Sequence, residues 1–404
     1  LGMTNSVRDS LGLSRPVRLL CSIAASAGDA QTAAGRCRYA LSQDRRLQWV
    51  VAGHAGQGRP QAHWAQGLRA LMAGELSALV WMADDLALHD FLLADRVQEW
   101  QAQGLSTLVA SKDGREVLRV QMASHVLKSD LADRTGADLV HDARGRMAMS
   151  VAGQALVDAA PPSHAPLLLV TASRAAPQRF YTHTALGRSV HRLRAMGVPL
   201  RVRAACSNRQ ALAEVYNAAI DPAFADHIVV FVHDDVVIED HFIGARLEEA
   251  LQQFDLVGLA GSRQREPGQP AWPFPRRVGQ WEHRERLLGC VGHDTTGRTG
   301  RGRKMRKVSH FGATRGPAQL LDGLLLAMRM QTLLDHPLRF DPALAFDFYD
   351  LDFCRRAEQA GLRPGVWPIA VTHLSAGDFD SPSWRRTYPV YLEKWGERPP
   401  EHTP

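Results

Sequence analysis

The sequence lacks the features that mark several large classes of protein. It has only five cysteines, an odd number with no CxxC pair, which indicates neither a disulfide framework nor a thiolate zinc site. No segment reaches the roughly 18 uninterrupted apolar residues of a membrane span, and the first eight residues lack the apolar core of a signal peptide. We therefore expect a protein of the reducing cytoplasm without a transmembrane segment.

Length and composition are those of an ordinary globular protein with a basic charge. The 404 residues predict two or three domains, because single cores seldom grow past about 250 residues. Hydrophobic residues make up 45% of the chain, which is enough for a core. The formal net charge of +6 favours anionic ligands but names none.

A proline-rich stretch at 159–166 divides the chain, because prolines prevent a helix from continuing. After it, strand-like and helical segments alternate as βαβαβ, which predicts a parallel sheet. The expected strands are 167–171, 200–204 and 228–232, and the expected helices are 186–196 and 211–220.

The last of these strands runs directly into a histidine and two acids, His233, Asp234 and Asp235. In open α/β sheets, ligands bind outside the carboxyl ends of the strands, where Thr171 and Ser173 also fall. Adjacent acids at such an edge can hold a divalent metal beside a phosphate. The alternative is that one of the acids caps a helix expected near 240–253, or that both are simply solvated.

A second acidic cluster occupies 346–353, and His373 follows a strand-like run at 366–371. Within the cluster, Asp350 can serve as a general base, but it can also cap the helix expected at 351–360. Taken alone, His373 is as readily a packed or surface histidine as a metal ligand.

A basic run at 298–307 carries six Lys or Arg residues in ten. It fits a phosphate clamp or lid, or a solvated loop. We favour the loop, because glycines and arginines interleave without an apolar face. No aromatic residue lies within the run, so nucleic-acid binding is not expected.

Further motifs follow in order along the second half: Leu321-Asp322-Gly323, Phe340-Asp341, Phe348 to Cys354, and Val371 to Gly377. Together with His233-Asp234-Asp235-Val236, this set resembles the family 2-like GT-A glycosyltransferases, in the branch related to the streptomycin-biosynthesis type. The resemblance covers residues 167–380, about half the chain.

The resemblance implies a nucleotide-diphosphate sugar donor, with Mn²⁺ or Mg²⁺ bridging its two phosphates. A hard cation there offsets the charge that develops on the leaving diphosphate. In the family's pattern, Asp235 and His233 occupy the DXD position, His373 is the last metal ligand, and Asp350 is the base, with Asp352 in reserve and Tyr349 replacing the family's Glu. The implied donor-binding residues are Thr171, Ser173, Asn208, Asn217 and Asp234, although either asparagine can equally cap its helix.

Two tryptophans of the second half, Trp272 and Trp281, fit stacking on an acceptor sugar. They fit core anchors at least as well, because tryptophan is common in both settings.

The first half holds a glycine-rich segment at 50–60 and strand-like runs near 79–83, 108–110 and 119–121. This series resembles the NADPH-binding lobe of ferredoxin-reductase-type flavoproteins. The resemblance implies that Gly53, Gly56 and Gly58 approach the pyrophosphate, and that Ser111, Lys112 and Gln121 hold the 2′-phosphate.

The first half departs from that family in three ways. Only about forty residues precede the lobe, residues 18–24 lack the flavin-stacking tyrosine, and Val140 replaces the family's late cysteine. We therefore expect a truncated relic that binds NADPH weakly at most and carries no FAD. A rival interpretation is internal duplication, because 81–86 echoes 231–236, but nothing equivalent to Asp350 or His373 follows.

The sequence as a whole predicts an α/β protein: a GT-A fold with a mostly parallel mixed sheet and flanking helices, preceded by a smaller Rossmann-like α/β domain. The expected divisions are a remnant or irregular segment at 1–46, the Rossmann-like domain at 47–158, a linker at 159–166, the GT-A domain at 167–380 and a tail at 381–404.

The predicted function is an inverting, metal-dependent glycosyltransferase that acts on a carbohydrate or another hydroxyl acceptor. The alternative is an NADPH-dependent electron-transfer module in the first half. A non-catalytic scaffold would require both sites to be decayed.

Overall fold

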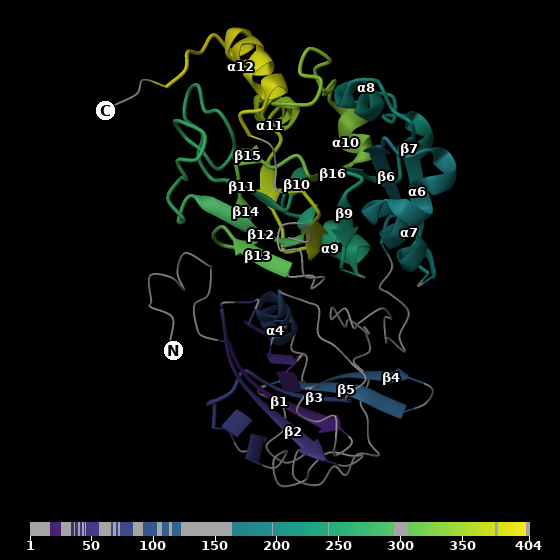
Figure 1. Ribbon diagram of the computed structural model, residues 1–404, viewed down its shortest axis with the longest axis vertical. Coiled ribbons are helices and arrows are strands. Elements are labelled where there is room, and N and C mark those ends of the chain that lie inside the picture. Colours follow the sequence, from purple (N-terminus) through teal and green to yellow (C-terminus); the bar gives the residue numbers. More distant parts are fainter. Residues whose placement is uncertain are drawn as a thin grey trace. The chain divides into compact units, whose positions relative to one another are not determined.

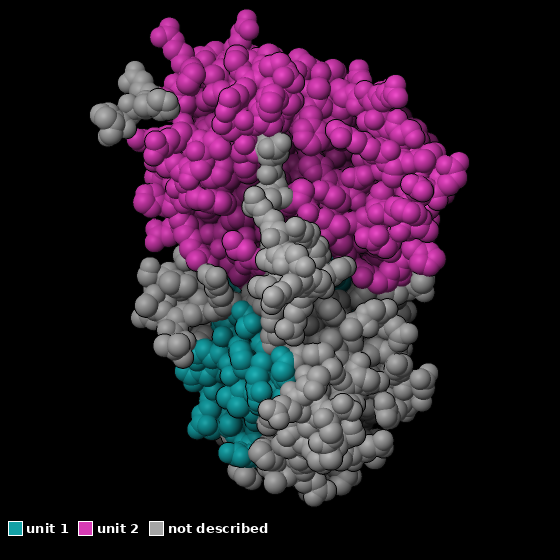
Figure 2. Space-filling view, viewed as in Figure 1, with its two compact units in different colours: residues 1–9, 13–162, 239–242 teal, residues 10–12, 163–238, 243–404 magenta. Residues whose placement is uncertain are grey.

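The computed structural model describes residues 17–25, residues 34–122 with gaps, and residues 164–400 except 196, 241, 295–305 and 376–378. The chain divides into two compact units (Figure 1, Figure 2). Of the described residues, unit 1 contains those up to 122 together with 239–242, and unit 2 contains the rest. No helix within these described ranges is long and apolar enough to span a membrane.

Unit 1 is built on a five-stranded sheet with the order β2-β1-β3-β5-β4. β1 lies between β2 and β3 and runs parallel to both, while β5 and β4 form an antiparallel hairpin. The bounds are β1 Val17–Ala25, β2 Leu47–Ala55, β3 Ala78–Ala83, α4 Leu93–Ala102, β4 Thr107–Lys112 and β5 Arg115–Met122.

The position of β1 differs from our expectation of a remnant or irregular segment at 1–46. Val17, Leu19 and Cys21 are buried at alternate positions, which is the period of a strand that packs one face on a core. β1 therefore belongs to the interior of the sheet. The sheet itself is mixed, and its three parallel strands do not by themselves confirm a Rossmann-like domain.

Unit 2 contains a seven-stranded sheet with the order β14-β17-β10-β16-β8-β6-β7. The predicted βαβαβ segment is confirmed: β6 runs parallel to β7 and to β8. β10 and β17 are also parallel, whereas β16 is antiparallel to both of its neighbours and β14 is antiparallel to β17. The sheet is thus mixed rather than mostly parallel. Its strands are β6 Leu167–Ala172, β7 Leu200–Ala205, β8 Ile228–Val232, β10 Leu256–Gly258, β14 Gly316–Pro317, β16 Leu325–Arg329 and β17 Pro364–Val366.

A six-stranded sheet completes unit 2, with the order β15-β11-β12-β18-β9 and with β13 paired to β12. β12 runs parallel to β18 and antiparallel to β13. Its strands are β9 Val236–Ile238, β11 Ala260–Ser262, β12 Leu287–Asp294, β13 Arg306–His310, β15 Leu320–Leu321 and β18 Val371–His373.

The helices of unit 2 pack on these sheets, with α7 against β9, α8 against β6, α10 against β16, and α11 against β15 and β17. Their bounds are α6 Pro177–His183, α7 Ala185–Ala195, α8 Leu212–Asn217, α9 Ile243–Ala250, α10 Met330–Asp335, α11 Tyr349–Gln359 and α12 Pro382–Trp395. The segment predicted as a tail at 381–404 therefore contains a 14-residue helix. The strand-like run at 366–371 is divided between β17 and β18.

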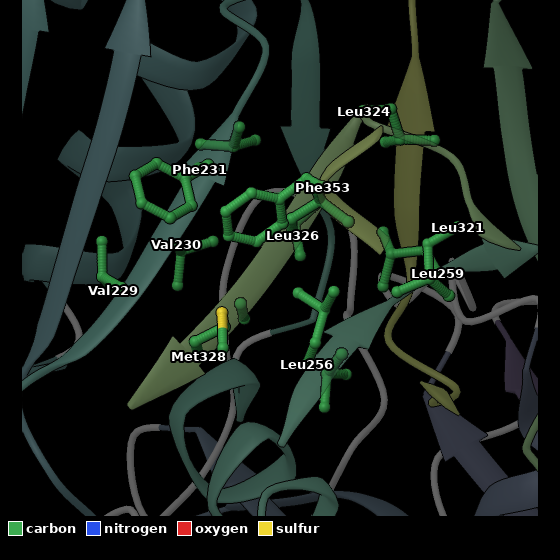
Figure 3. Close-up of a cluster of buried hydrophobic side chains, with 14 of the residues drawn as sticks. Val229, Val230, Phe231, Leu256, Leu259, Leu321, Leu324, Leu326, Met328 and Phe353 are labelled. Atoms are coloured by element: carbon green, nitrogen blue, oxygen red, sulfur yellow. The ribbon is translucent and has the colours of Figure 1, made fainter. Parts of the chain in front are cut away.

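The core of unit 2 fixes β8, the strand that leads into the acidic turn. All five residues of β8 are buried, as expected for a central strand covered on both faces. Figure 3 shows Phe231 of β8 near Leu326 of β16 and Phe353 of α11. The ring of Phe353 stacks on Phe340 with the centroids 4.0 Å apart. Each such buried side chain contributes about 1.5–3 kcal/mol, so the end of β8 is held firmly.

Candidate metal centre and catalytic carboxylate

The three residues implied as metal ligands lie together at the ends of two strands. His233 directly follows β8, Asp235 lies in the turn between β8 and β9, and His373 ends β18, which pairs with β9. One nitrogen or oxygen atom from each lies within 4.8 Å of the other two. The backbone fixes this arrangement, because the Leu374 amide donates to the Asp235 carbonyl at 3.1 Å.

The ring of His233 is oriented by Tyr349. Its Nε2 lies 2.9 Å from the Tyr349 hydroxyl, and that hydroxyl lies 2.9 Å from the carbonyl oxygen of Gly323. Because a carbonyl only accepts, the hydroxyl proton goes to Gly323, and the Nε2–H of His233 donates to the hydroxyl. This assignment leaves Nδ1 with its lone pair, the form of imidazole that binds a metal.

Asp235 and His373 form a half-buried ion pair, with Oδ1 3.3 Å from Nε2. Burial acts to raise the pKa of Asp235, but the hydrogen bond and charge of His373 outweigh it and hold the pKa below its ordinary value. Burial acts to lower the pKa of His373, and Asp235 outweighs it and raises the pKa. Asp235 is therefore ionised at neutral pH, as a metal ligand must be.

Two imidazoles and one carboxylate fit a first-row transition ion such as Mn²⁺ better than Mg²⁺. Imidazole nitrogen is a ligand for transition metals, whereas Mg²⁺ takes almost only oxygen ligands. The residues present can thus hold a metal, provided that water or substrate oxygens complete its coordination.

Asp350 lies in the first turn of α11, directly after Tyr349. Its Oδ2 accepts from the Gly323 amide and its Oδ1 from the Leu351 amide, each at 2.9 Å. The helix begins at Tyr349 after Phe348, so Asp350 is not its N-cap. Burial and the charge of Asp322 raise the pKa of Asp350 to about 7, against the opposing effect of its backbone hydrogen bonds. A carboxylate with this pKa is suited to accept a proton near neutral pH.

Asp322 belongs to the same site, although we did not single it out as a site residue from the sequence. Its Oδ2 accepts from Trp272 Nε1 at 2.8 Å, and its Oδ1 accepts from the Leu324 amide at 2.9 Å. Its negative charge acts to raise the pKa values of Asp350, His233 and His373. The sequence signal for this residue is the pair Asp322-Gly323, because the site has no room for a side chain at position 323. A Cβ on Gly323 would lie 2.2 Å from the Tyr349 hydroxyl oxygen.

The two tryptophans have different settings. Trp272 is buried and bonded to Asp322, which matches the alternative that it anchors the core. Trp281 is 56% exposed and stacks on Phe311 at a centroid distance of 5.9 Å.

Asp352, the reserve base, does not join the site. It is fully buried and accepts from Trp395 Nε1 at 3.0 Å, and its Oδ1 lies 2.7 Å from Lys394 Nζ. Burial raises its pKa even though Lys394 opposes the shift. Asp352 therefore joins α11 to α12.

The five residues implied to bind the donor are only partly brought together. Ser173 donates to Asp234 at 2.5 Å, which joins the ends of β6 and β8. Thr171 is fully buried and bonds to the neighbouring Ala172 carbonyl. Asn208 closes a turn on the backbone of Gln210. Asn217 pairs both ends of its amide with the backbone of Phe340, at 2.7 and 2.8 Å, so it braces that segment.

Those residues implied to bind NADPH that the structure describes lie on three different strands. Gly56 and Gly58 lie outside the described residues, and Gly53 lies in β2. Ser111 and Lys112 lie near the turn of the β4–β5 hairpin, whereas Gln121 pairs with Thr107 at its other end. Thr107 and Ser111 are four residue steps apart along the strand, roughly 13 Å. One phosphate cannot meet both positions, which gives the reductase alternative no support from these strands.

Comparisons with known proteins give only distant similarities. The sequence matches no protein-family model and no curated protein. Among solved structures, GalNAc-T7 with UDP, GalNAc and Mn²⁺ is similar at 9% identity and a TM-score of 0.34 over 57% of this chain and 48% of that one. A197 from STIV is similar at 12% identity and a TM-score of 0.27, over 52% of this chain and 82% of that one.

HddC from Yersinia pseudotuberculosis, complexed with GMP-PN, also matches at 12% identity and a TM-score of 0.27, over 57% of this chain and 99% of that one. The chain spans about half the length of GalNAc-T7. TM-scores this low carry no argument about function, so we base the proposed function on the site itself.

Proposed function

We propose that the chain is a metal-dependent glycosyltransferase that moves a sugar from a nucleotide-diphosphate donor to an acceptor hydroxyl. The observation that carries this proposal is that Tyr349 and Gly323 connect the three candidate metal ligands to the candidate base, Asp350. His233, Asp235 and His373 can hold a cation, and Tyr349 bonds to His233. The next residue, Asp350, is a carboxylate with a pKa of about 7. A cation site and a base in one site suit this reaction.

Each side chain has a defined task in this proposal. His233, Asp235 and His373 would hold a Mn²⁺ ion, which when bound supplies positive charge for the leaving diphosphate. Asp234, fixed by Ser173, faces the donor. Asp350 accepts the proton of the acceptor hydroxyl as its oxygen forms a bond to the anomeric carbon and the nucleotide diphosphate leaves. A single displacement of this kind inverts the anomeric centre.

Asp350 and Tyr349 are positioned as a unit. Gly323 donates its amide to Asp350 and accepts from Tyr349 through its carbonyl. Phe348, which precedes them, has a left-handed φ of 65°, a conformation that costs a non-glycine residue about 1–2 kcal/mol. Its ring stacks on Tyr388 and Tyr391 of α12, which offsets that cost.

Thermal unfolding with nucleotide sugars tests the proposal. We expect UDP-, GDP- or dTDP-sugars to raise the melting temperature only when Mn²⁺ is present, because a ligand at 100 times its Kd stabilises by about 2.7 kcal/mol. Asp235→Ala should abolish this shift. The matched control is Asp226→Ala, which changes an exposed acid just before β8 and should leave the shift intact. A metal-independent shift that survives in Asp235→Ala would contradict the proposal.

A further inference from the structure

Beside the candidate metal centre, a row of basic side chains crosses three neighbouring strands. β12 lies between β13 and β18, and the register places Lys307 opposite His293 and His293 opposite His373. Directly opposed residues of a sheet project from the same face, and adjacent strands lie about 4.8 Å apart. Lys307, His293 and His373 therefore form one row that begins at the metal centre.

The side chains agree with this register. The rings of His293 and His373 have centroids 6.4 Å apart, close to the 6.0 Å between His233 and His373. His373 thus lies between two other imidazoles. His293 is not one of the three clustered candidate ligands, and its Nδ1 is buried without a hydrogen-bond partner. Lys307 is exposed. Burial and the charges of His373 and Lys307 lower the pKa of His293, against the opposing effect of a backbone hydrogen bond with Ser375.

We propose that His293 and Lys307 form a phosphate-binding row that holds the terminal phosphate of a nucleoside diphosphate whose oxygens also meet the metal. This inference rests on the proposed function and extends it. β18, which carries His373, lies between β12, which carries His293, and β9, and the turn that holds Asp234, bonded to Ser173, leads into β9. Ser173 and Asp234 thus approach His373 from the β9 side, and the row approaches it from the β12 side. A nucleotide lying across the centre would place its nucleoside on that side and its last phosphate toward His293.

Size and charge fit this occupant. Lys307 lies opposite His293 on the next strand, so a phosphate beside His293 is within reach of its long, flexible side chain. Two acids, Asp235 and Asp322, face the same region and oppose an anion. The row is therefore expected to bind phosphate only when a divalent cation offsets their charge. A nucleoside monophosphate, which ends at its first phosphate, would leave the row empty.

Calorimetry of UDP and UMP in excess Mn²⁺ tests the inference on the full chain. We expect His293→Gln and Lys307→Ala each to weaken UDP binding about 10- to 100-fold, the size of one hydrogen bond to a charged group, and to leave UMP binding unchanged. Lys307→Arg should restore binding. Arg276→Ala, at another exposed basic residue of unit 2, is the matched control.

Manganese binding measured separately by electron paramagnetic resonance distinguishes the possible failures. If the wild-type chain binds no Mn²⁺, the proposed function itself fails. If Mn²⁺ and UDP bind and both variants bind UDP as the wild type does, the phosphate-binding row is wrong while the metal centre stands.

Discussion

At the scale of single residues, the site depends on Gly323 and the two side chains that its backbone holds. Its carbonyl accepts from Tyr349 and its amide donates to Asp350, so the backbone of one residue sets both the orientation of a candidate metal ligand and the position of the candidate base. The His233 ring is then fixed through Tyr349. Small changes at these residues are therefore expected to have separable effects on metal affinity and on transfer.

Asp350→Asn tests the base. The amide keeps the shape of the side chain but cannot take the proton of the acceptor, so we expect donor binding to persist and transfer to fall about 10²–10⁴-fold. Because the pKa of Asp350 is about 7, its carboxylate form increases as pH rises through 7, and wild-type turnover should rise with it. Sugar transfer measured from pH 5 to 9 checks this. Near-wild-type turnover of the variant would exclude Asp350 as the base.

Tyr349→Phe tests the orienting hydrogen bond. It removes only the hydroxyl that receives Nε2–H of His233, and loss of such a partner typically weakens metal affinity 10–100-fold. Titration with Mn²⁺ measures this, and Tyr181→Phe, an exposed tyrosine of α6, is the control. Unchanged Mn²⁺ affinity in Tyr349→Phe would show that His233 does not need this partner.

At the scale of elements, side chains of α12 brace the start of α11, which also packs on β15 and β17. Asp352 of α11 is fully buried against Lys394 and Trp395, and Phe348 stacks on Tyr388 and Tyr391. Arg355 adds an ion pair to Glu397, with atoms 2.6 Å apart. The helix that begins with Tyr349 and Asp350 is thus positioned by the C-terminal helix.

Asp352→Asn should destabilise the fold and spare the chemistry. It removes the buried charge that pairs with Lys394, which keeps its ion pair with Asp341, and this loss costs on the order of 1–3 kcal/mol. We expect a lower melting temperature with turnover per folded molecule close to the wild type. Asp380→Asn, in the exposed pair with Arg385, should change the melting temperature little. If Asp352→Asn is stable but inactive, Asp352 and not Asp350 is the base.

The elements also show what could be predicted from the sequence. The runs 167–170 and 228–232 are uniformly apolar, so their strands were predictable, and their alternation with helices predicted the parallel arrangement that β6 and β8 have. The role of Asp352 was not, because its partners lie in α12, more than forty residues away. Likewise, nothing local to Asp322 indicates that it raises the pKa of Asp350, since that effect exists only once the two are buried together.

At the scale of the whole molecule, unit 2 carries every group of the proposed reaction. The described strands of unit 1 separate Ser111 from Gln121 along a hairpin. The resemblance of unit 1 to an NADPH-binding lobe depended only on the order of motifs along the sequence. That order does not determine which residues lie close together across a sheet. We therefore regard glycosyl transfer as the function that the geometry supports best.

NADPH should not bind to unit 1 with useful affinity. No single phosphate can contact both ends of the β4–β5 hairpin, so the expected 2′-phosphate contacts cannot form together. We expect NADPH at 1 mM, roughly the upper end of typical KM values, to leave the melting temperature unchanged and the purified chain to be colourless. A yellow protein, or a shift with NADPH that is absent with NADH, would restore the reductase alternative.

Manganese binding to the wild-type chain and to Asp235→Ala tests the central claim most directly. Electron paramagnetic resonance counts free Mn²⁺ and needs neither the correct donor sugar nor the acceptor. We expect one Mn²⁺ per chain, bound more tightly when UDP is present, and loss of this site in Asp235→Ala but not in Asp226→Ala. Equal Mn²⁺ binding by the wild type and Asp235→Ala, or none by either, would contradict it.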